Sequence, residues 1–421
     1  MQAIVSFRSV PRILGLLNRE ASLGMTWVPH FTSAINWTLR LGLGLLQQVV
    51  PIDTPWLAII DHSIDIGTKK ALVVLRVPLT ALATRGSAIC LEDCECVGLK
   101  ISDQINGETV AADLKTIFTQ AGLPTAIIKD ADHTLNKGVC LWQDKHDAVV
   151  PVIYDIGHAA ANALKREFEN NGAYQRFVAM INQGTKCLRQ TNLAFLVPPK
   201  LRSKGRFQSI SNLGKWSAKM IEVLAISESH QSSPMLTKLR EVLPGFQRLK
   251  RFVQRFAATT HIVARMSDVL KNQGLNPKTF KACLQLLDTL PQKSKTQQRL
   301  RSWLKHHFKI HTQLAAQHTA DLSLMVSSDI IESLFGNFKH IIERSPQADM
   351  NRATLIIPAL CGSMNTTIVE RALAQTRHQD LQGWEQDNIP YTLRKKRQAF
   401  FTTFGNHQSQ IPVNLPLRLT G

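Results

Sequence analysis

The sequence lacks several features that would fix its class at once. Glycine and proline number only 22 and 18 of 421 residues, which excludes a collagen-like or low-complexity chain. The longest apolar stretches, residues 41–52 and 71–83, are too short and too interrupted to span a bilayer. The N-terminal apolar run contains Arg8 and Arg12 and has no clear cleavage site, which argues against a secretory signal. We therefore expect a cytoplasmic protein with no membrane partner.

Cysteine is also sparse. The seven cysteines are scattered, and although Cys90, Cys94 and Cys96 cluster, no second cysteine pair or nearby histidine pair completes a zinc site. We expect reduced thiols. The apolar fraction of 44% is high enough for a large core, so the chain is not disordered as a whole.

Acidic residues are nearly missing from one segment. Residues 166–320 contain 26 basic and 7 acidic residues, an excess equal to the net charge of the whole chain, +19. Residues 53–165 have the opposite balance, with 10 basic and 14 acidic residues. A concentrated positive field attracts a polyanion, most commonly nucleic acid, although a solvated helical face without a partner gives the same composition.

The pattern of apolar residues divides the chain into four segments. Residues 1–52 predict two helices, 9–18 and 30–47, around a break at 24–29, which resembles a helix-turn-helix DNA-binding segment or any small helical bundle. On the second helix, the side chains that could contact a DNA groove are Thr32, Ser33, Asn36 and Arg40.

The second segment, residues 53–165, predicts a mixed α/β sheet. Its expected strands are 56–60, 71–77, 97–101, 124–129 and 149–154, and its clearest helices are 110–121 and 158–170. Residues 166–320 predict an all-α segment. Residues 321–421 begin with a helix over 330–344, followed by an apolar helical stretch over 352–369 and a peripheral tail.

Carboxylates follow the apolar strands of the predicted sheet. Asp61, Asp130 and Asp155 each end a strand, and Glu332 lies in the first turn of the later helix. Oxygen ligands of this kind bind Mg²⁺, and two metal ions can act on one phosphate. Each residue taken alone could instead be a turn former or a helix cap.

At these positions the chain resembles a DDE transposase with an RNase H-like core, of the groups whose core is split by a large helical insertion, namely the hAT, Mutator and P-element-like groups. The resemblance covers residues 30–345 in pieces. The matching segments are residues 57–61 (LAIID), 126–132 (AIIKDAD), 155–158 (DIGH, similar to the Cys/Asp-x-x-His element) and 328–336 (SDIIESLFG). The 202 residues from Asp130 to Glu332 leave room for the insertion.

The resemblance implies a chemistry and a site. It implies Mg²⁺ or Mn²⁺ held by Asp61, Asp130 and Glu332, with Asp132 as an alternative to Asp130. It implies His158 near the scissile phosphate as an orienting or acid–base group, with Asp155 positioning that turn.

The same resemblance implies cutting of double-stranded DNA at transposon ends and transfer of the freed 3′-OH to target DNA, by a homo-oligomer on the DNA. We expect a bacterial insertion sequence, nucleoid-associated when bound to DNA. The family usually has a larger N-terminal DNA-binding region, so an N-terminal truncation is expected.

Basic clusters in the insertion are the expected phosphate contacts, which position DNA without reading bases. They are Arg202, Lys204, Arg206, Arg248, Lys250, Arg251 and Arg255, next to Phe207, Phe246, Phe252 and Phe256. Each basic residue could equally be part of an exposed helix face. Trp216 could stack on a flipped base or lie in the core.

Three other functions stay open. They are an RNase H-like nuclease without strand transfer, a catalytically inactive DNA-binding remnant of a mobile element, and an RNA-binding helical protein.

Overall fold

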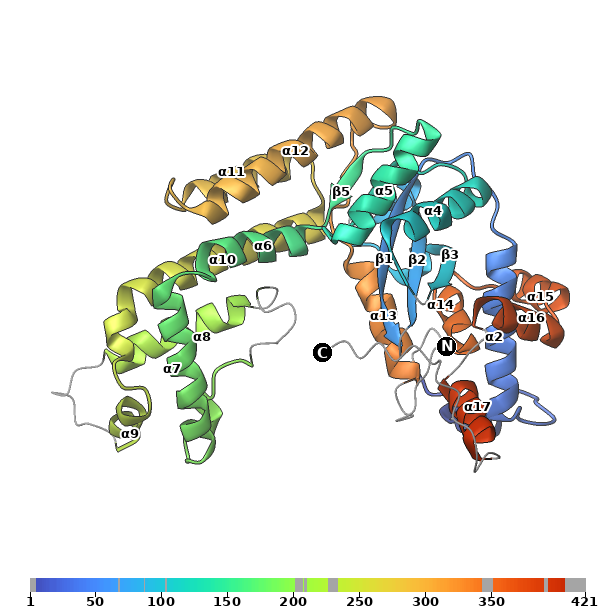
Figure 1. Ribbon diagram of the computed structural model, residues 1–421, viewed down its shortest axis with the longest axis horizontal. Helices are drawn as coiled ribbons and strands as arrows, with labels where there is room; N and C mark the ends of the chain where they lie inside the picture. The colour runs from blue at the N-terminus through green and yellow to red at the C-terminus, as the bar shows by residue number, and fades with distance from the viewer. Residues whose placement is uncertain are drawn as a thin grey trace.

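The computed structural model describes residues 5–66, 69–86, 88–102, 104–200, 207, 210–225, 234–342, 351–389 and 393–405. Within these residues an α/β body carries a large helical extension (Figure 1). None of the described helices is both long enough and apolar enough to cross a membrane.

The α/β body is built on a mixed five-stranded sheet of order β3-β2-β1-β4-β5. The strands are β1 (Trp56–Ile66), β2 (Lys69–Pro78), β3 (Glu95–Ser102), β4 (Ala126–Lys129) and β5 (Val152–Tyr154). The first three strands pair antiparallel, and β4 and β5 extend the sheet from β1 in parallel. This topology confirms the predicted α/β class with an RNase H-like sheet.

The two faces of the sheet are covered by different helices. Helices α4 (Gly107–Ala121) and α5 (His133–His146) pack against Ala58, Ile60 and Ile127 on one face. On the other face, Leu57, Ile59, Ile128 and Ile153 belong to a core shared with α2 (Phe31–Gln47), α13 (Asp329–Ile342) and α14 (Ile356–Ala359). Successive strand residues point to opposite faces, except where the register shifts, after Asp61 in the β1–β2 pair and after Val74 in the β2–β3 pair.

The helical insertion separates β5 from α13 in sequence, and its described residues within 166–320 form helices and loops but no strand. An isolated bridge joins Leu275 of the insertion to Leu324 beyond it. Its elements are α7 (Gly172–Arg189), η2 (Ala194–Leu196), α8 (Ile210–Leu224), α9 (Pro234–Val242), η3 (Phe246–Leu249), α10 (Lys250–Gln273), α11 (Pro277–Asp288) and α12 (Lys295–Gln317). Helix α6 (Ile156–Phe168) leads out of the sheet and packs against α10 and α12 (Figure 1).

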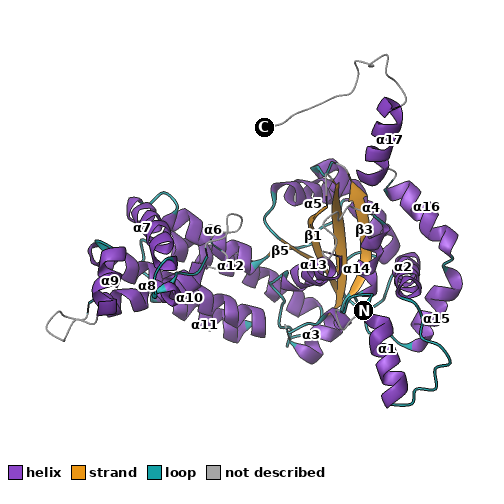
Figure 2. Ribbon diagram, turned by 90° about the horizontal axis from the view of Figure 1, so that it is seen from below, coloured by secondary structure: helices purple, strands orange, loops and turns teal. Residues whose placement is uncertain are grey.

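Among the described residues, several contacts join the insertion to the α/β body. Nε2 of buried His307 on α12 accepts a hydrogen bond of 2.9 Å from the backbone N–H of Tyr154 in the edge strand β5. Lys271 at the end of α10 forms an ion pair of 2.6 Å with Asp329 at the start of α13. The Leu275–Leu324 bridge lies beside that pair in sequence. Figure 2 shows the insertion on one side of the molecule and the sheet on the other.

The N-terminal helices differ from the helix-turn-helix expectation. Helix α1 (Ser9–Glu20) and α2 form as predicted, but residues 21–30 connect them, whereas the motif uses a turn of about three or four residues. Helix α2 packs against the body instead of standing apart: a Cβ at Gly42 would lie 1.8 Å from the carbonyl oxygen of Leu355, so only glycine permits this approach.

The remaining elements surround this packing. They are α3 (Leu79–Arg85), η1 (Leu91–Asp93), η4 (Arg352–Leu355), α15 (Thr366–Gln375), α16 (His378–Asn388) and α17 (Leu393–Gly405). The expected helix over 352–369 is broken, because η4 and α14 end before Gly362, whose φ is +81°. Helices α15 and α16 pack against α2 and therefore belong to the body.

Candidate active site

Three aspartates lie where the parallel pairing of the sheet ends, but Asp61 does not end its strand as expected, because β1 continues to Ile66. In the sheet register Ile60 lies opposite Lys129, and Lys129 lies opposite Tyr154, so Asp61, Asp130 and Asp155 follow at the same level. Each is two residues beyond a side chain on the α13 face: Ile59, Ile128 and Ile153. Alternation along a strand therefore directs all three carboxylates toward the face that α13 covers.

Asp130 and Asp132 have different surroundings. One carboxylate oxygen of Asp132 accepts the backbone N–H groups of Thr134 and Leu135 at 2.7 and 3.1 Å, which caps α5, and lies 3.1 Å from Nε2 of His62. Burial opposes ionisation of Asp132, but these hydrogen bonds outweigh it and lower its pKa. Oδ1 of Asp130 accepts the N–H of Asp132 at 3.0 Å, and Oδ2 of Asp130 lies 4.0 Å from Nε2 of His158.

Asp155 connects two distant parts of the site. It is 2% exposed, and its Oδ1 accepts the backbone N–H of His158 at 2.7 Å and lies 3.0 Å from His158 Nδ1. Its Oδ2 accepts the N–H of Ser328, immediately before α13, at 2.8 Å. Burial opposes ionisation of Asp155, but these hydrogen bonds lower its pKa. One buried carboxylate therefore holds both the histidine and the start of the helix that bears Glu332.

His158 is arranged to keep a proton. Its hydrogen bond to Asp155 raises its pKa to about 9, against the opposing effect of burial, and the charges of Asp130 and Glu332 act in the same direction. Nδ1 points to Asp155, so Nε2 is the atom that faces Asp130 and any bound substrate.

Glu332 lies one helical turn into α13, on its exposed side. Partial burial raises the pKa of Glu332, the carboxylates of Asp155, Asp329 and Asp61 raise it further, and the charge of His158 opposes them. Asp61 and Glu332 are therefore close enough to interact, although they are distant in sequence.

The donor set suits a hard divalent cation. Mg²⁺ is usually bound by one or two carboxylates, with waters and substrate phosphates completing its octahedron. Within the described residues no group of three or more Asp, Glu, His or Cys side chains is arranged so that it could hold a metal ion. The nearby carboxylates at Glu332 repel one another. Such an arrangement is consistent with a cation that binds together with a phosphate, whereas a structural metal site needs its ligands closer together.

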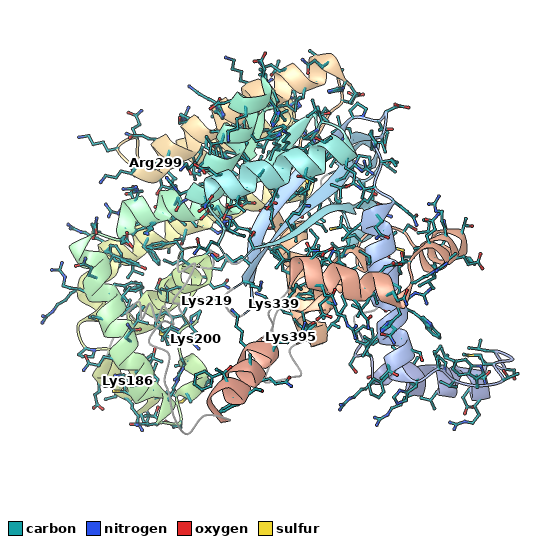
Figure 3. All side chains as sticks on the ribbon, turned by 45° about the vertical axis from the view of Figure 1, so that its right-hand side comes forward. Lys186, Lys200, Lys219, Arg299, Lys339 and Lys395 are labelled. Atoms are coloured by element: carbon teal, nitrogen blue, oxygen red, sulfur yellow. The ribbon has the colours of Figure 1, made fainter. Side chains whose placement is uncertain are left out.

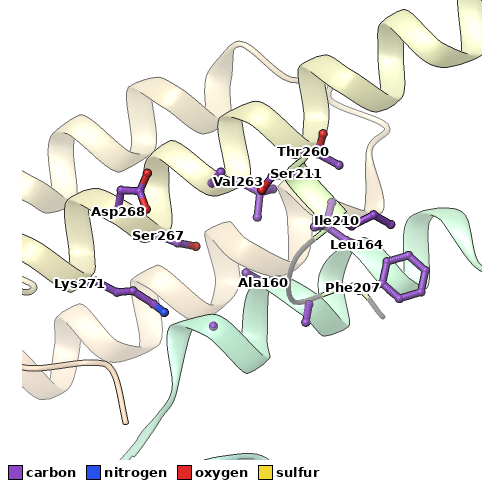
Figure 4. Close-up of a pocket in the computed structure, with 13 residues that line it drawn as sticks. Ala160, Leu164, Phe207, Ile210, Ser211, Thr260, Val263, Ser267, Asp268 and Lys271 are labelled. Carbon is purple, nitrogen blue, oxygen red and sulfur yellow. The ribbon is translucent and has the colours of Figure 1, made fainter. Parts of the chain in front are cut away.

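A small cavity lies beside this site, between α6, α8 and α10 (Figure 4). Its volume is about 160 Å³, below the range of about 300–1,000 Å³ that is typical of small-molecule sites. Gly157 and Lys271 line the end toward the carboxylates, and Ala160, Leu164 and Val263 line much of the rest. We assign no ligand to it.

The predicted phosphate contacts in the insertion fall into two groups. Arg248, Lys250, Arg251 and Arg255 are exposed on η3 and α10. Arg202, Lys204 and Arg206 lie outside the described residues.

The neighbouring aromatic residues belong to the core. Phe252 and Phe256 pack with Phe168, Tyr174 and Phe177 at ring-centroid distances of 5.1 to 6.4 Å. Phe207 and Phe246 are also buried. Trp216 packs against the core and donates from Nε1 to the carbonyl of Leu196 at 3.0 Å. Of its two predicted roles, the structure therefore favours the core position.

The side chain of Arg40 forms hydrogen bonds within the protein. Its Nε donates to the carbonyl of Thr376 at 2.6 Å, and its guanidinium also donates to the carbonyl of Leu373, at the end of α15. These contacts satisfy the last carbonyls of a helix. We therefore leave Arg40 out of the DNA-facing surface proposed below. Of its predicted neighbours, Thr32 is exposed, and Ser33 and Asn36 are partly buried.

Lys271 and His307, whose side chains link the insertion to the site, could not be predicted from the sequence. Their partners, Asp329 and Tyr154, lie 58 and 153 residues away. No local motif marks contacts of this range.

No family model and no curated protein matches the chain. One similar solved structure is the Drosophila P element transposase strand transfer complex, with 11% identity and a TM-score of 0.41 over 85% of this chain and 99% of that chain. The bacterial origin expected from the sequence stays a prediction.

Proposed function

We propose that this chain is a DDE-type transposase that cuts double-stranded DNA at transposon ends and transfers the freed 3′-OH to target DNA. The observation that carries the proposal is that Asp61 of β1 and Asp130 after β4 lie at the same level of an RNase H-like sheet, on the face that α13 covers with Glu332. The excess of basic residues in the insertion supports DNA as the substrate.

Asp61, Asp130 and Glu332 would hold Mg²⁺ or Mn²⁺. The bound cation would supply a polarised phosphate and an activated attacking oxygen. Asp130 is preferred to Asp132, because the Asp132 carboxylate already caps α5 and contacts His62.

The chain's own residues would orient the phosphate. With Nδ1 of His158 held by Asp155, its protonated Nε2 can donate a hydrogen bond to a phosphate oxygen or a proton to the departing oxygen. Asp155 and the Lys271–Asp329 pair would keep α13 in place, so that Glu332 stays near the aspartates.

The test is cleavage of a supercoiled plasmid that carries the DNA flanking this coding sequence on both sides. We expect Mg²⁺-dependent cutting by the wild type, loss of cutting by Glu332→Gln, and unchanged DNA binding by that variant. A labelled target duplex in the same reaction reports strand transfer.

The outcomes separate the alternatives. Cutting without joined products would favour an RNase H-like nuclease. Absence of cutting by a folded wild type that still binds DNA would favour an inactive remnant. Cutting that survives in Glu332→Gln would contradict the proposed site.

A further inference from the structure

The last helix of the insertion, α12, carries positive charge with no acidic residue near it in sequence. Residues 289–320 contain six Lys or Arg residues and no Asp or Glu. Arg301 pairs with Asp288 at the end of α11. The other Lys and Arg residues of α12 are Lys295, Arg299, Lys305 and Lys309. None of these four forms an ion pair within the described part of the chain, so the protein does not neutralise their charge.

Most of these cations lie in one row of exposed side chains. Residues 295, 299, 302, 306, 309 and 313 are separated by four, three, four, three and four positions, which places them on one face of a helix. All six are exposed, namely Lys295, Arg299, Ser302, His306, Lys309 and Gln313. Leu300, Leu304 and His307 lie on the other face and are buried. The helix is therefore held by one face and presents a polar, basic face to solvent.

The exposed face of α12 has no large apolar side chain. Among the described residues of the insertion, the exposed large apolar side chains are Phe195, Val223 and Met235, and none of them lies on α11 or α12. Protein interfaces concentrate aromatic and apolar residues at their centre, whereas DNA interfaces are more polar and much more positively charged. The composition of this face therefore favours DNA over a protein partner.

The length of the row also suits a duplex. Lys295 and Lys309 are 14 residues apart, which is about 21 Å along a helix axis. One strand of duplex DNA has a phosphate about every 3.4 Å along its axis, so this length covers about six base steps. Three cations spread over that distance can each contact a different phosphate of one duplex, whereas a single small anion could contact only one of them.

The row lies on the outer side of the insertion. Helices α6 and α10 lie between α12 and the pair α7 and α8 (Figure 1). Figure 3 shows Arg299 at the outer side, whereas Lys200 and Lys219 lie toward the space between the insertion and the α/β body. DNA bound along α12 would therefore be held outside the active site.

We propose that the exposed row of α12, from Lys295 to Gln313, is a binding surface for the sugar-phosphate backbone of duplex DNA, separate from the active site. Lys295, Arg299 and Lys309 neutralise phosphates along one duplex, and Ser302 adds a hydrogen-bonding group between them. Contacts of this kind position DNA without reading its bases. This inference rests on the proposed function, because it takes DNA as the substrate.

A double substitution tests the surface without touching the carboxylates. Arg299→Ala combined with Lys309→Ala removes two charges of the row, and alanine preserves the helix. The matched control is Lys115→Ala combined with Lys145→Ala, at two exposed lysines of α4 and α5, which changes the net charge by the same amount. Binding to a short fluorescent duplex is measured in EDTA over a range of salt concentrations. The melting temperature and the molecular mass of each protein without DNA are measured alongside.

We expect the α12 variant to bind the duplex more weakly, with an unchanged melting temperature. The slope of log affinity against log salt should become smaller by about 2, because two phosphate contacts are lost. The control variant should keep the affinity and the slope of the wild type.

Three results would overturn the surface and leave the proposed function intact. They are an unchanged slope in the α12 variant, equal losses in the α12 and control variants, and a wild-type dimer that the α12 variant no longer forms, which would assign the row to contact between copies of this chain. A wild type that binds no DNA would overturn the proposed function and the surface with it.

Discussion

The sheet edge and the helical insertion use charge in opposite ways. At the sheet edge, a few carboxylates are drawn together, and Asp155 is 2% exposed with both oxygens hydrogen-bonded. In the insertion, Arg248, Lys250, Arg251 and Arg255 lie on the surface while the aromatic residues next to them fill the core. Asp155 is therefore held in place by its hydrogen bonds, whereas the basic side chains of α10 stay exposed to solvent. Under the proposed function, the first arrangement suits a precisely positioned site and the second suits contact with a long polyanion.

The largest expected effect separates two neighbouring aspartates of the sheet edge. Asp130→Asn should reduce cleavage by about 10³-fold, because the loss of a metal ligand forfeits several kcal/mol of transition-state stabilisation. Asp132→Asn keeps an oxygen that can cap α5, so its activity should fall less than tenfold. Cleavage rates of both variants at saturating Mg²⁺ check this, and equal losses would contradict the assignment of Asp130.

Two adjacent residues of α10, one exposed and one buried, test this difference within the insertion. Phe256 is fully buried, so Phe256→Ala should lower the free energy of unfolding by about 3–5 kcal/mol. Arg255 is exposed, so Arg255→Ala should change that free energy by less than about 0.5 kcal/mol and should weaken DNA binding in a salt-dependent manner. Denaturant titrations and duplex binding give both values. If Arg255→Ala lowered the free energy of unfolding and left DNA binding unchanged, Arg255 would have a structural role and would not contact DNA.

A buried histidine at the joint between the two regions should make stability depend on pH. Burial lowers the pKa of His307 to about 4, helped by the nearby His306 and opposed by the hydrogen bond to the Trp303 carbonyl. The folded state therefore favours neutral His307, and the unfolded chain takes up a proton near its ordinary value of about 6.5. The resulting stability is complete above that value and is lost as the pH falls toward about 4, by about 3 kcal/mol at most.

His307→Gln should remove this loss between pH 6.5 and 4, because glutamine can accept from the Tyr154 N–H without titrating. His306→Gln, at the exposed neighbour, should retain it. Unfolding free energies of the three proteins across this pH range are the measurement. Parallel pH curves for the wild type and His307→Gln would show that the contact does not depend on the neutral imidazole.

The last prediction concerns the stability contributed by Arg40 of α2. Arg40→Ala removes hydrogen bonds to the carbonyls of Leu373 and Thr376 and should cost about 1–2 kcal/mol of stability. DNA affinity should not change. A loss of DNA affinity with unchanged stability would restore Arg40 to the DNA-facing surface.

The common level of Asp61 and Asp130 could be predicted from the sequence, because each follows a short apolar run and the two runs pair in parallel. Their role as metal ligands stays a prediction. The sheet and the all-α character of the insertion followed from the same apolar periodicity. The surroundings of Trp216, Phe256 and Arg40 did not follow, since helical spacing alone does not identify the face that another helix covers. The contact of Asp155 with Ser328 spans 173 residues and depends on how the insertion returns the chain to the sheet.

The most direct test of the central claim asks where the metal binds. Fe²⁺ can replace Mg²⁺ on oxygen ligands, and with ascorbate and hydrogen peroxide it generates hydroxyl radicals that cut the nearby polypeptide backbone. The account predicts cuts near residues 61, 130 and 332, all of them suppressed by excess Mg²⁺ and by the Asp130→Asn substitution. Cuts at only one of these segments, or at unrelated positions that Mg²⁺ does not suppress, would contradict a shared metal site built from β1, β4 and α13.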